Sequence, residues 1–149
     1  MYTCITLVLN KDKILMIYKK RGLGRGLFSF PGGKVEHGEN GKECAIRELK
    51  EETMLIAKEV ECAGKILFKV DGEDAETMEV YIVRKFEGIP METDEAIPIW
   101  VNIDEIPYDK MWEDDKHWVP LVIEGRKIEC EFYFSNNWEK FDGGSCIFK

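Results

Sequence analysis

A cluster of glutamates at helical spacing is the feature that most constrains how this chain can fold. Glu48, Glu51 and Glu52 lie within residues 40–54, where apolar side chains recur every three or four positions and predict a helix. At positions i, i+3 and i+4, their carboxylates share one face of that helix. Like charges at this spacing repel, so the helix is weakened unless a cation lies among them. Hard divalent cations prefer oxygen ligands of this kind, and the segment therefore indicates a metal site on a helix.

An isolated E-x-x-E-E pattern is more often a solvated charged face, but the residues around this one favour a metal site. Gly33 is followed after five residues by Glu39, and after seven more by the run RELKEETML at residues 47–55. This spacing resembles the Nudix box, G-x5-E-x7-R-E-U-x-E-E-x-G-U with U aliphatic, and eight of its nine defined positions are met. Such a match arises by chance on the order of 10⁻⁷ per starting position. The exception is Met54, which replaces a glycine that ends the helix in the family.

The resemblance implies a role for each acidic residue of the site. Glu48, Glu51 and Glu52 would hold Mg²⁺, or Mn²⁺ in its place. The backbone carbonyl of Gly32 and the carboxylate of Glu95 would be further ligands. One of Glu51, Glu52 and Glu95 would orient or deprotonate the attacking water, and the sequence does not choose among them.

The same resemblance implies a supporting structure for the ligands. Glu39 and Arg47 would form an ion pair that fixes the loop after Gly33 against the helix. The whole segment would clamp a diphosphate and cleave it by in-line attack of water on phosphorus.

The rest of the chain predicts an α+β protein with more strands than helices. Asn40 and Glu43 have the spacing of a capping box at the start of the glutamate-bearing helix, and residues 114–124 predict a second helix. The predicted strands are Tyr2–Asn10, Ile14–Lys19, Phe28–Phe30, Lys65–Val70, Met78–Glu87, Ile97–Ile103 and, as the final one, Lys127–Phe134. Without repeats or linkers, residues 1–149 are expected to form one domain. The architecture expected is an α/β/α sandwich, the Nudix fold, with a mixed sheet packed between helices.

Composition limits the partners of the chain. A net charge of −8 argues against nucleic-acid polymers and anionic membranes, although a bound metal would still admit a small phosphorylated substrate. The N-terminal residues lack the features of a signal peptide, and no apolar run is long enough to span a bilayer. The five cysteines, at positions 4, 44, 62, 130 and 146, form no close pair and are expected to be unpaired thiols. A cytoplasmic monomer or weak dimer is therefore expected.

Segments outside the box resemble one Nudix subgroup, the MutT-type and animal-type diphosphatases of oxidised purine nucleoside triphosphates. The similar stretches are KKRGLGRG before the box, and TDEAIPIW and IDEIPYDKMWEDDKHWVPL after it. The resemblance implies that Trp112 stacks on the base while Asp114 and Asp115 read its Watson–Crick edge. Two adjacent carboxyls should raise one pKa, so that one donates while the other accepts. Taken alone, these residues would suit an exposed acidic turn that opens a helix.

The resemblance also assigns further residues of this chain to the substrate pocket of the subgroup, and some of them differ from the residue that the subgroup usually has. Its apolar lining corresponds to Phe28, Phe68 and Met78, any of which could equally be core. Ser29 stands where an asparagine usually reaches the base, and Leu23 stands where an aromatic residue usually lies. Both changes bear on the base preference. Lys34, beside the glycines, is the basic residue best placed to approach the substrate.

The sequence therefore predicts a hydrolase of acid anhydrides in phosphorus-containing substrates. The favoured activity is magnesium-dependent hydrolysis of oxidised purine nucleoside triphosphates such as 8-oxo-dGTP to monophosphate and pyrophosphate, a nucleotide-pool function that protects DNA. One alternative keeps the site but changes the substrate to another nucleoside diphosphate derivative, such as ADP-ribose or a nucleotide sugar. The other alternative is a nucleotide-binding module without catalysis, which the intact glutamates oppose.

Overall fold

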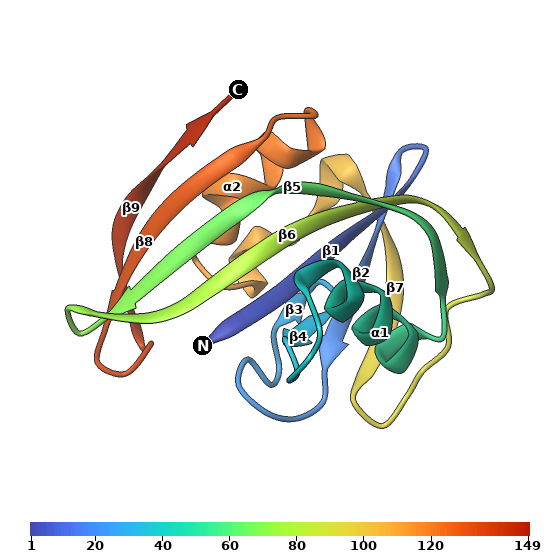
Figure 1. Cartoon of the computed structure of the whole chain (residues 1–149), viewed down its shortest axis with the longest axis horizontal. Coiled ribbons are helices and arrows are strands. Elements are labelled where there is room, and N and C mark those ends of the chain that lie inside the picture. The colour runs from blue at the N-terminus through green and yellow to red at the C-terminus, as the bar shows by residue number, and fades with distance from the viewer.

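The computed structural model describes residues 1–149 as a single large mixed sheet with two α-helices (Figure 1). The strands are β1 (Tyr2–Asn10), β2 (Lys13–Lys19), β3 (Phe28–Ser29), β4 (Gly32–Lys34), β5 (Ile56–Val70), β6 (Glu73–Glu87), β7 (Ala96–Asn102), β8 (Ile128–Ser135) and β9 (Lys140–Phe148). The helices are α1 (Gly41–Thr53) and α2 (Asp115–Ile123). Two short 3₁₀ turns, Ile103–Glu105 and Tyr108–Lys110, connect β7 to α2. Neither α-helix has the length and apolar composition that a membrane crossing requires.

Strand β1 lies at the centre of the sheet. It runs parallel to β6 and antiparallel to β2 and β4. Strand β5 extends the sheet from β6 in antiparallel fashion, and β8 then pairs with β5 in parallel. Both directions of pairing occur, so the predicted mixed sheet is confirmed.

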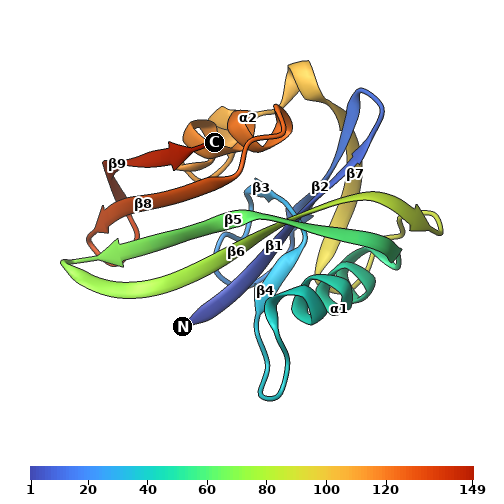
Figure 2. The same ribbon diagram turned by 45° about the horizontal axis from the view of Figure 1, so that its top comes forward.

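The two faces of the sheet are covered by different helices (Figure 2). Alternate side chains of β1 point to opposite faces. Leu7 belongs to the large core cluster that includes Trp118 of α2, whereas Val8 packs in a separate cluster with Leu49 of α1. The predicted arrangement of a mixed sheet between helices is therefore confirmed.

Helix α1 begins and ends as local chemistry dictates, with one departure. The Asn40 side chain accepts a hydrogen bond from the Glu43 backbone N–H, and the Glu43 side chain accepts one from the Asn40 N–H, so the predicted capping box is present. At the other end, Met54 adopts the left-handed conformation with φ of 71°, and its N–H donates to the Lys50 carbonyl. A glycine would take this conformation without strain, so Met54 keeps the geometry of the helix end at some cost in stability.

The C-terminal sheet is longer than the sequence predicted. Strand β9 was missed because Gly143 and Gly144 interrupt any strand pattern. The structure shows why a glycine fits there: a Cβ on Gly144 would lie 2.2 Å from the Glu131 carbonyl oxygen of β8. Strand β5 also begins earlier than predicted, because its pairing with β6 continues through residues 56–64, where charged side chains hide the apolar pattern. Strand β6 begins earlier as well, because its residues 73–77 pair with residues 67–70 of β5.

The expectation for the cysteines was wrong. Disulfide bonds join Cys4 of β1 to Cys44 of α1, and Cys130 of β8 to Cys146 of β9, and only Cys62 is free. The sequence separations of 40 and 16 residues gave no sign of pairing, because strand register and the packing of α1 on β1 bring the partners together.

Candidate active site

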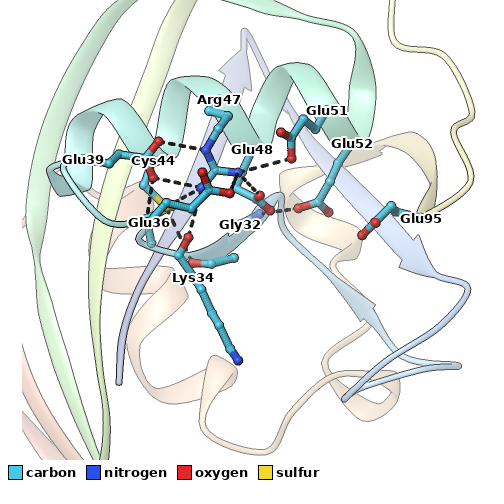
Figure 3. Close-up of polar contacts among 12 residues, drawn as sticks. Gly32, Lys34, Glu36, Glu39, Cys44, Arg47, Glu48, Glu51, Glu52 and Glu95 are labelled. Atoms are coloured by element: carbon cyan, nitrogen blue, oxygen red, sulfur yellow. Dashed lines mark hydrogen bonds and ion pairs between the residues drawn. A yellow bond between two sulfur atoms is a disulfide. The ribbon is translucent and has the colours of Figure 1, made fainter.

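Arg47 is the centre of a half-buried ion-pair network between α1 and the segment that precedes it (Figure 3). Its Nε donates to Glu39 Oε2 at 2.8 Å and its Nη2 donates to Glu39 Oε1 at 2.9 Å, a bidentate pair. Nη2 also donates to the Lys34 backbone carbonyl at 3.0 Å, and Nη1 reaches Glu48 and Glu51. The Arg47 hydrogen bond is the main cause that lowers the pKa of Glu39. Arg47 thus joins the loop before the helix to two of the predicted metal ligands.

Glu52 is the buried member of the glutamate cluster, with 4% of its surface exposed. Its Oε1 accepts a hydrogen bond from the Gly32 backbone N–H at 3.1 Å. Burial, reinforced by the Glu48 carboxyl nearby, raises the pKa of Glu52 to about 9. Burial and the nearby Glu48 also raise the pKa of Glu51, whereas Arg47 lowers it. Without a cation, burial and the neighbouring carboxyls therefore favour the neutral form of Glu52, whereas a bound cation would favour its charged form.

The close approach of β4 to the helix depends on a glycine. A Cβ on Gly33 would lie 2.2 Å from Glu48 Oε2, so any larger residue would displace that carboxylate. This contact gives a physical reason for the glycine that opens the motif.

Glu95 reaches the same region from the loop between β6 and β7. The Thr93 hydroxyl donates to the Glu52 backbone carbonyl at 3.2 Å, and the Met91 N–H donates to the Thr53 carbonyl at 2.9 Å. These bonds hold the loop against the end of α1, and Figure 3 shows the Glu95 side chain on the Glu52 side of the cluster. Glu95 is half-exposed and pairs with Arg21 at 3.2 Å.

The donor set fits a hard divalent cation, although the side chains do not converge as a ready-made cage. No group of three or more acidic, histidine or cysteine side chains meets at one point in the structure, because Glu48 and Glu51 are turned toward Arg47. The chemistry nevertheless suits Mg²⁺ or Mn²⁺: every donor is oxygen, and the buried Glu52 carboxylate has like charges beside it that a cation would offset.

A cavity of about 250 Å³ extends from this glutamate cluster to the N-terminus of α2. Gly32, Gly33 and Glu52 line one end, and Trp112, Asp114 and Asp115 line the other. Residues separated by about half the chain therefore share one cavity. A substrate with phosphates at the first end and a base at the second would span the two groups.

Asp114 and Asp115 are almost fully buried at 3% and 4% exposure. Burial raises the pKa of Asp114 to about 6, although the hydrogen bond from Trp118 Nε1 to Asp114 Oδ2 at 3.0 Å opposes that shift. Burial and the neighbouring Asp114 charge raise the pKa of Asp115 well above its usual value. The pair can therefore hold a proton at neutral pH, which makes one carboxyl a donor and leaves the other an acceptor.

The structure brings most of the predicted base-pocket residues into this cavity. Those that line it are Leu23, Ser29, Lys34, Phe68, Met78, Trp112, Asp114 and Asp115. Phe28 is the exception. Its ring packs edge-on against Tyr18, with ring centroids 5.4 Å apart, and it does not line the cavity. Phe30, two residues later and 2% exposed, lines it instead.

Several lining residues were missed by sequence reasoning. Trp138 lies in the turn between β8 and β9 and packs on Trp112 with ring centroids 6.0 Å apart. Thr3 and Glu76 also line the cavity. Each lies at the end of a row of inward-facing side chains, Thr3 on β1 and Glu76 on β6. The period-2 alternation of β1 and β6 could have identified this last pair, because polar residues there continue a row of apolar ones.

Comparison with known proteins places the chain among related sequences and folds. The NUDIX domain family matches residues 2–122. The chain is 39% identical over 135 residues to the oxidized purine nucleoside triphosphate hydrolase of Danio rerio, covering 89% of this chain and 86% of that protein. It is 37% identical over 138 residues to the protein of the same name from Mus musculus, covering 91% and 87% respectively. The MutT crystal structure from Bacillus halodurans superposes with a TM-score of 0.83 at 24% identity, covering 97% of this chain and 96% of that one.

Proposed function

The chain belongs to the Nudix family of hydrolases, and we propose that it hydrolyses oxidised purine nucleoside triphosphates, such as 8-oxo-dGTP, to monophosphate and pyrophosphate. Nudix hydrolases act on small nucleotides and need divalent metal ions. We further propose Mg²⁺ as the ion, with Mn²⁺ as a substitute. Such an activity would remove oxidised nucleotides before they enter DNA.

One observation carries this proposal: Glu52 and the Trp112–Asp115 segment line the same cavity. A phosphate-cleaving site alone would fit many nucleoside diphosphate derivatives. A buried acidic pair beside an indole adds the means to recognise a purine, since carboxyls can pair with the hydrogen-bonding edge of the base.

The ligand roles follow from burial and neighbours. Glu52, with support from Glu48 and Glu51, would hold the ion, and the Gly32 N–H fixes the Glu52 carboxylate. Arg47 keeps Glu48 and Glu51 on the same side of the helix while it anchors Glu39. When bound, the ion would neutralise the charge that develops on the phosphate oxygens.

The chemical step requires a base near the phosphates. A water oxygen would attack phosphorus, the bond to the pyrophosphate leaving group would break, and a carboxylate would take the water proton. Glu51 and Glu95 are half-exposed and lie on either side of Glu52 in Figure 3, so each can meet solvent and substrate. Lys34 lines the cavity without a partner for its ammonium group and is placed to meet a phosphate.

A pyrophosphate-release assay across a panel of substrates tests the proposal. The panel should contain oxidised and unmodified dGTP and dATP, ADP-ribose and a nucleotide sugar, each with and without Mg²⁺. We expect the highest kcat/KM for an oxidised purine triphosphate and no turnover without a divalent ion. Equal turnover of oxidised and unmodified triphosphates, or preference for ADP-ribose, would contradict the assignment.

A further inference from the structure

The inward faces of β1 and β6 both end in a polar residue beside the cavity. Thr3 and Glu76 each continue, at period 2, a row of core side chains. These rows are Ile5, Leu7 and Leu9 on β1, and Met78, Val80 and Ile82 on β6. Both polar residues line the cavity, and Glu76 is half-buried there. A carboxyl group therefore occupies a place where the strand pattern would put an apolar side chain.

Thr3 fixes the orientation of this carboxyl group. Its Oγ1 donates to Glu76 Oε2 at 2.6 Å, and Oε1 has no protein donor. Burial is the main cause that raises the pKa of Glu76, while the Thr3 hydrogen bond and the charges of the N-terminal amino group and Lys19 act in the opposite direction. The arrangement leaves one carboxyl oxygen available to a ligand in the cavity.

Glu76 belongs to a different element of the fold from the aspartate pair. It projects from the sheet, whereas Asp114 and Asp115 lie at the start of α2. It is nevertheless close enough for its charge to raise the pKa of Asp114. The cavity thus offers acidic groups from two different walls, and a planar base between them would meet both.

We propose that Glu76, oriented by Thr3, is a specificity-determining residue that accepts a hydrogen bond from N7–H of an oxidised purine while Asp114 and Asp115 read another edge. This inference rests on the proposed function. An unmodified purine carries an acceptor lone pair at N7, whereas an 8-oxo purine carries a hydrogen there. A carboxylate oxygen beside N7 bonds the oxidised base and repels the unmodified one, so Glu76 supplies the repulsive contact that selectivity requires.

Glu76→Gln tests the inference, because an amide can donate to N7 and removes the repulsion. The measurement is kcat/KM for 8-oxo-dGTP, dGTP and 7-deaza-dGTP, in which a C–H replaces the N7 lone pair. We expect the 8-oxo-dGTP to dGTP ratio to fall by about 10- to 100-fold in E76Q. We also expect the wild-type protein to prefer 7-deaza-dGTP over dGTP, and E76Q to lose that preference. Ratios taken on one preparation do not depend on its folded fraction.

Matched variants separate recognition from stability. Glu73→Gln changes an exposed glutamate of the same strand and should leave both ratios unchanged. Thr3→Val removes the orienting hydroxyl and should shift the ratios in the same direction as E76Q, whereas Thr3→Ser should retain them. If E76Q fails to fold, Thr3→Val and the wild-type preference for 7-deaza-dGTP carry the test.

The two proposals fail in different ways. A folded E76Q protein with wild-type ratios would overturn the role of Glu76, while a wild-type preference for 8-oxo-dGTP would leave the proposed function intact. Absence of any wild-type preference for oxidised purines would overturn the proposed function, and the role of Glu76 with it.

Discussion

The helix end of the cavity and its base-binding end both bury carboxyl groups beside like charges, but their surroundings differ. At the helix end, Glu52 accepts a backbone N–H from Gly32, and Arg47 pairs with the neighbouring glutamates. At the base-binding end, Asp114 and Asp115 have no arginine or lysine partner, and Trp118 supplies a neutral donor. The first arrangement suits a bound cation, whereas the second suits a shared proton.

This difference explains how one cavity can bind both ends of a nucleotide. Phosphates need positive charge, which a divalent ion between glutamates would supply. A nucleotide base needs hydrogen-bond donors and acceptors at fixed places, and an acidic pair that shares one proton supplies one of each. Such a pair does not attract phosphate. The four predictions that follow test the contrast, beginning with the largest expected effect.

Glu52→Gln should lower kcat by about 10²- to 10³-fold, because the neutral amide holds a divalent ion poorly. The same change should abolish the rise in melting temperature that Mg²⁺ gives to the wild-type protein. Steady-state kinetics and thermal unfolding with and without Mg²⁺ measure both effects. Glu73→Gln, which changes an exposed glutamate of β6 rather than one near Arg47, is the control and should behave like wild type. Full activity in E52Q would show that the helix end does not depend on a cation there.

The stability of the base-binding end should depend on pH in a defined direction. The pKa of Asp114 is raised to about 6 from the ordinary aspartate value of 3.8, so the folded state binds more protons than the unfolded state between these values. Below about pH 4, Asp114 therefore adds about 2 to 3 kcal/mol to the free energy of unfolding. This contribution is lost as the pH rises through about 6. Urea unfolding of the wild-type protein and Asp114→Asn across this range should show the variant gaining relative stability with pH. A difference that does not vary with pH would exclude the shared proton.

Asp115→Asn should reduce the preference for oxidised over unmodified purine triphosphates by about 10-fold or more, because an amide cannot hold the proton that Asp114 and Asp115 share. Turnover of the preferred nucleotide should fall less than in E52Q, since the phosphate end is untouched. Competition between 8-oxo-dGTP and dGTP in one reaction measures the preference directly. Glu113→Gln, next to the pair but exposed, should leave it unchanged.

Met54→Gly should have the smallest effect and should be favourable. The left-handed conformation at φ of 71° strains a residue with a Cβ, and glycine should raise the free energy of unfolding by about 1 kcal/mol. Activity should not change, because the Met54 side chain is half-exposed and lies outside the cavity. Urea unfolding together with a kinetic assay checks both statements, and a loss of stability would mean that Met54 makes a contact that offsets its strain.

Much of the helix end could be read from the sequence. The residues between Gly33 and Leu55 are contiguous, and the 3.6-residue period of a helix places Glu48, Glu51 and Glu52 on one side whatever surrounds them. The capping box at Asn40 is also a local interaction, and it was predicted correctly. Family resemblance added the roles of the glutamates, which remain predictions.

The base-binding end could be predicted only in part. Resemblance pointed to Trp112, Asp114 and Asp115, but not to Thr3, Glu76 or the cavity that joins them to Glu52. Neighbouring side chains of a strand face opposite ways, so the face on which each lies depends on register with distant strands. For the same reason Phe28 packs against Tyr18 rather than in the cavity.

The sequence by itself predicted the family, an α+β chain with more strands than helices, and the glutamate-bearing helix, because the spacing of residues close together in the chain indicates each of them. Only the tertiary structure decided which side chains share the cavity, which cysteines pair, and that Gly143 and Gly144 lie within a strand. These outcomes depend on contacts between residues far apart in the chain, where a shift of one residue in strand register would reverse every side chain's direction.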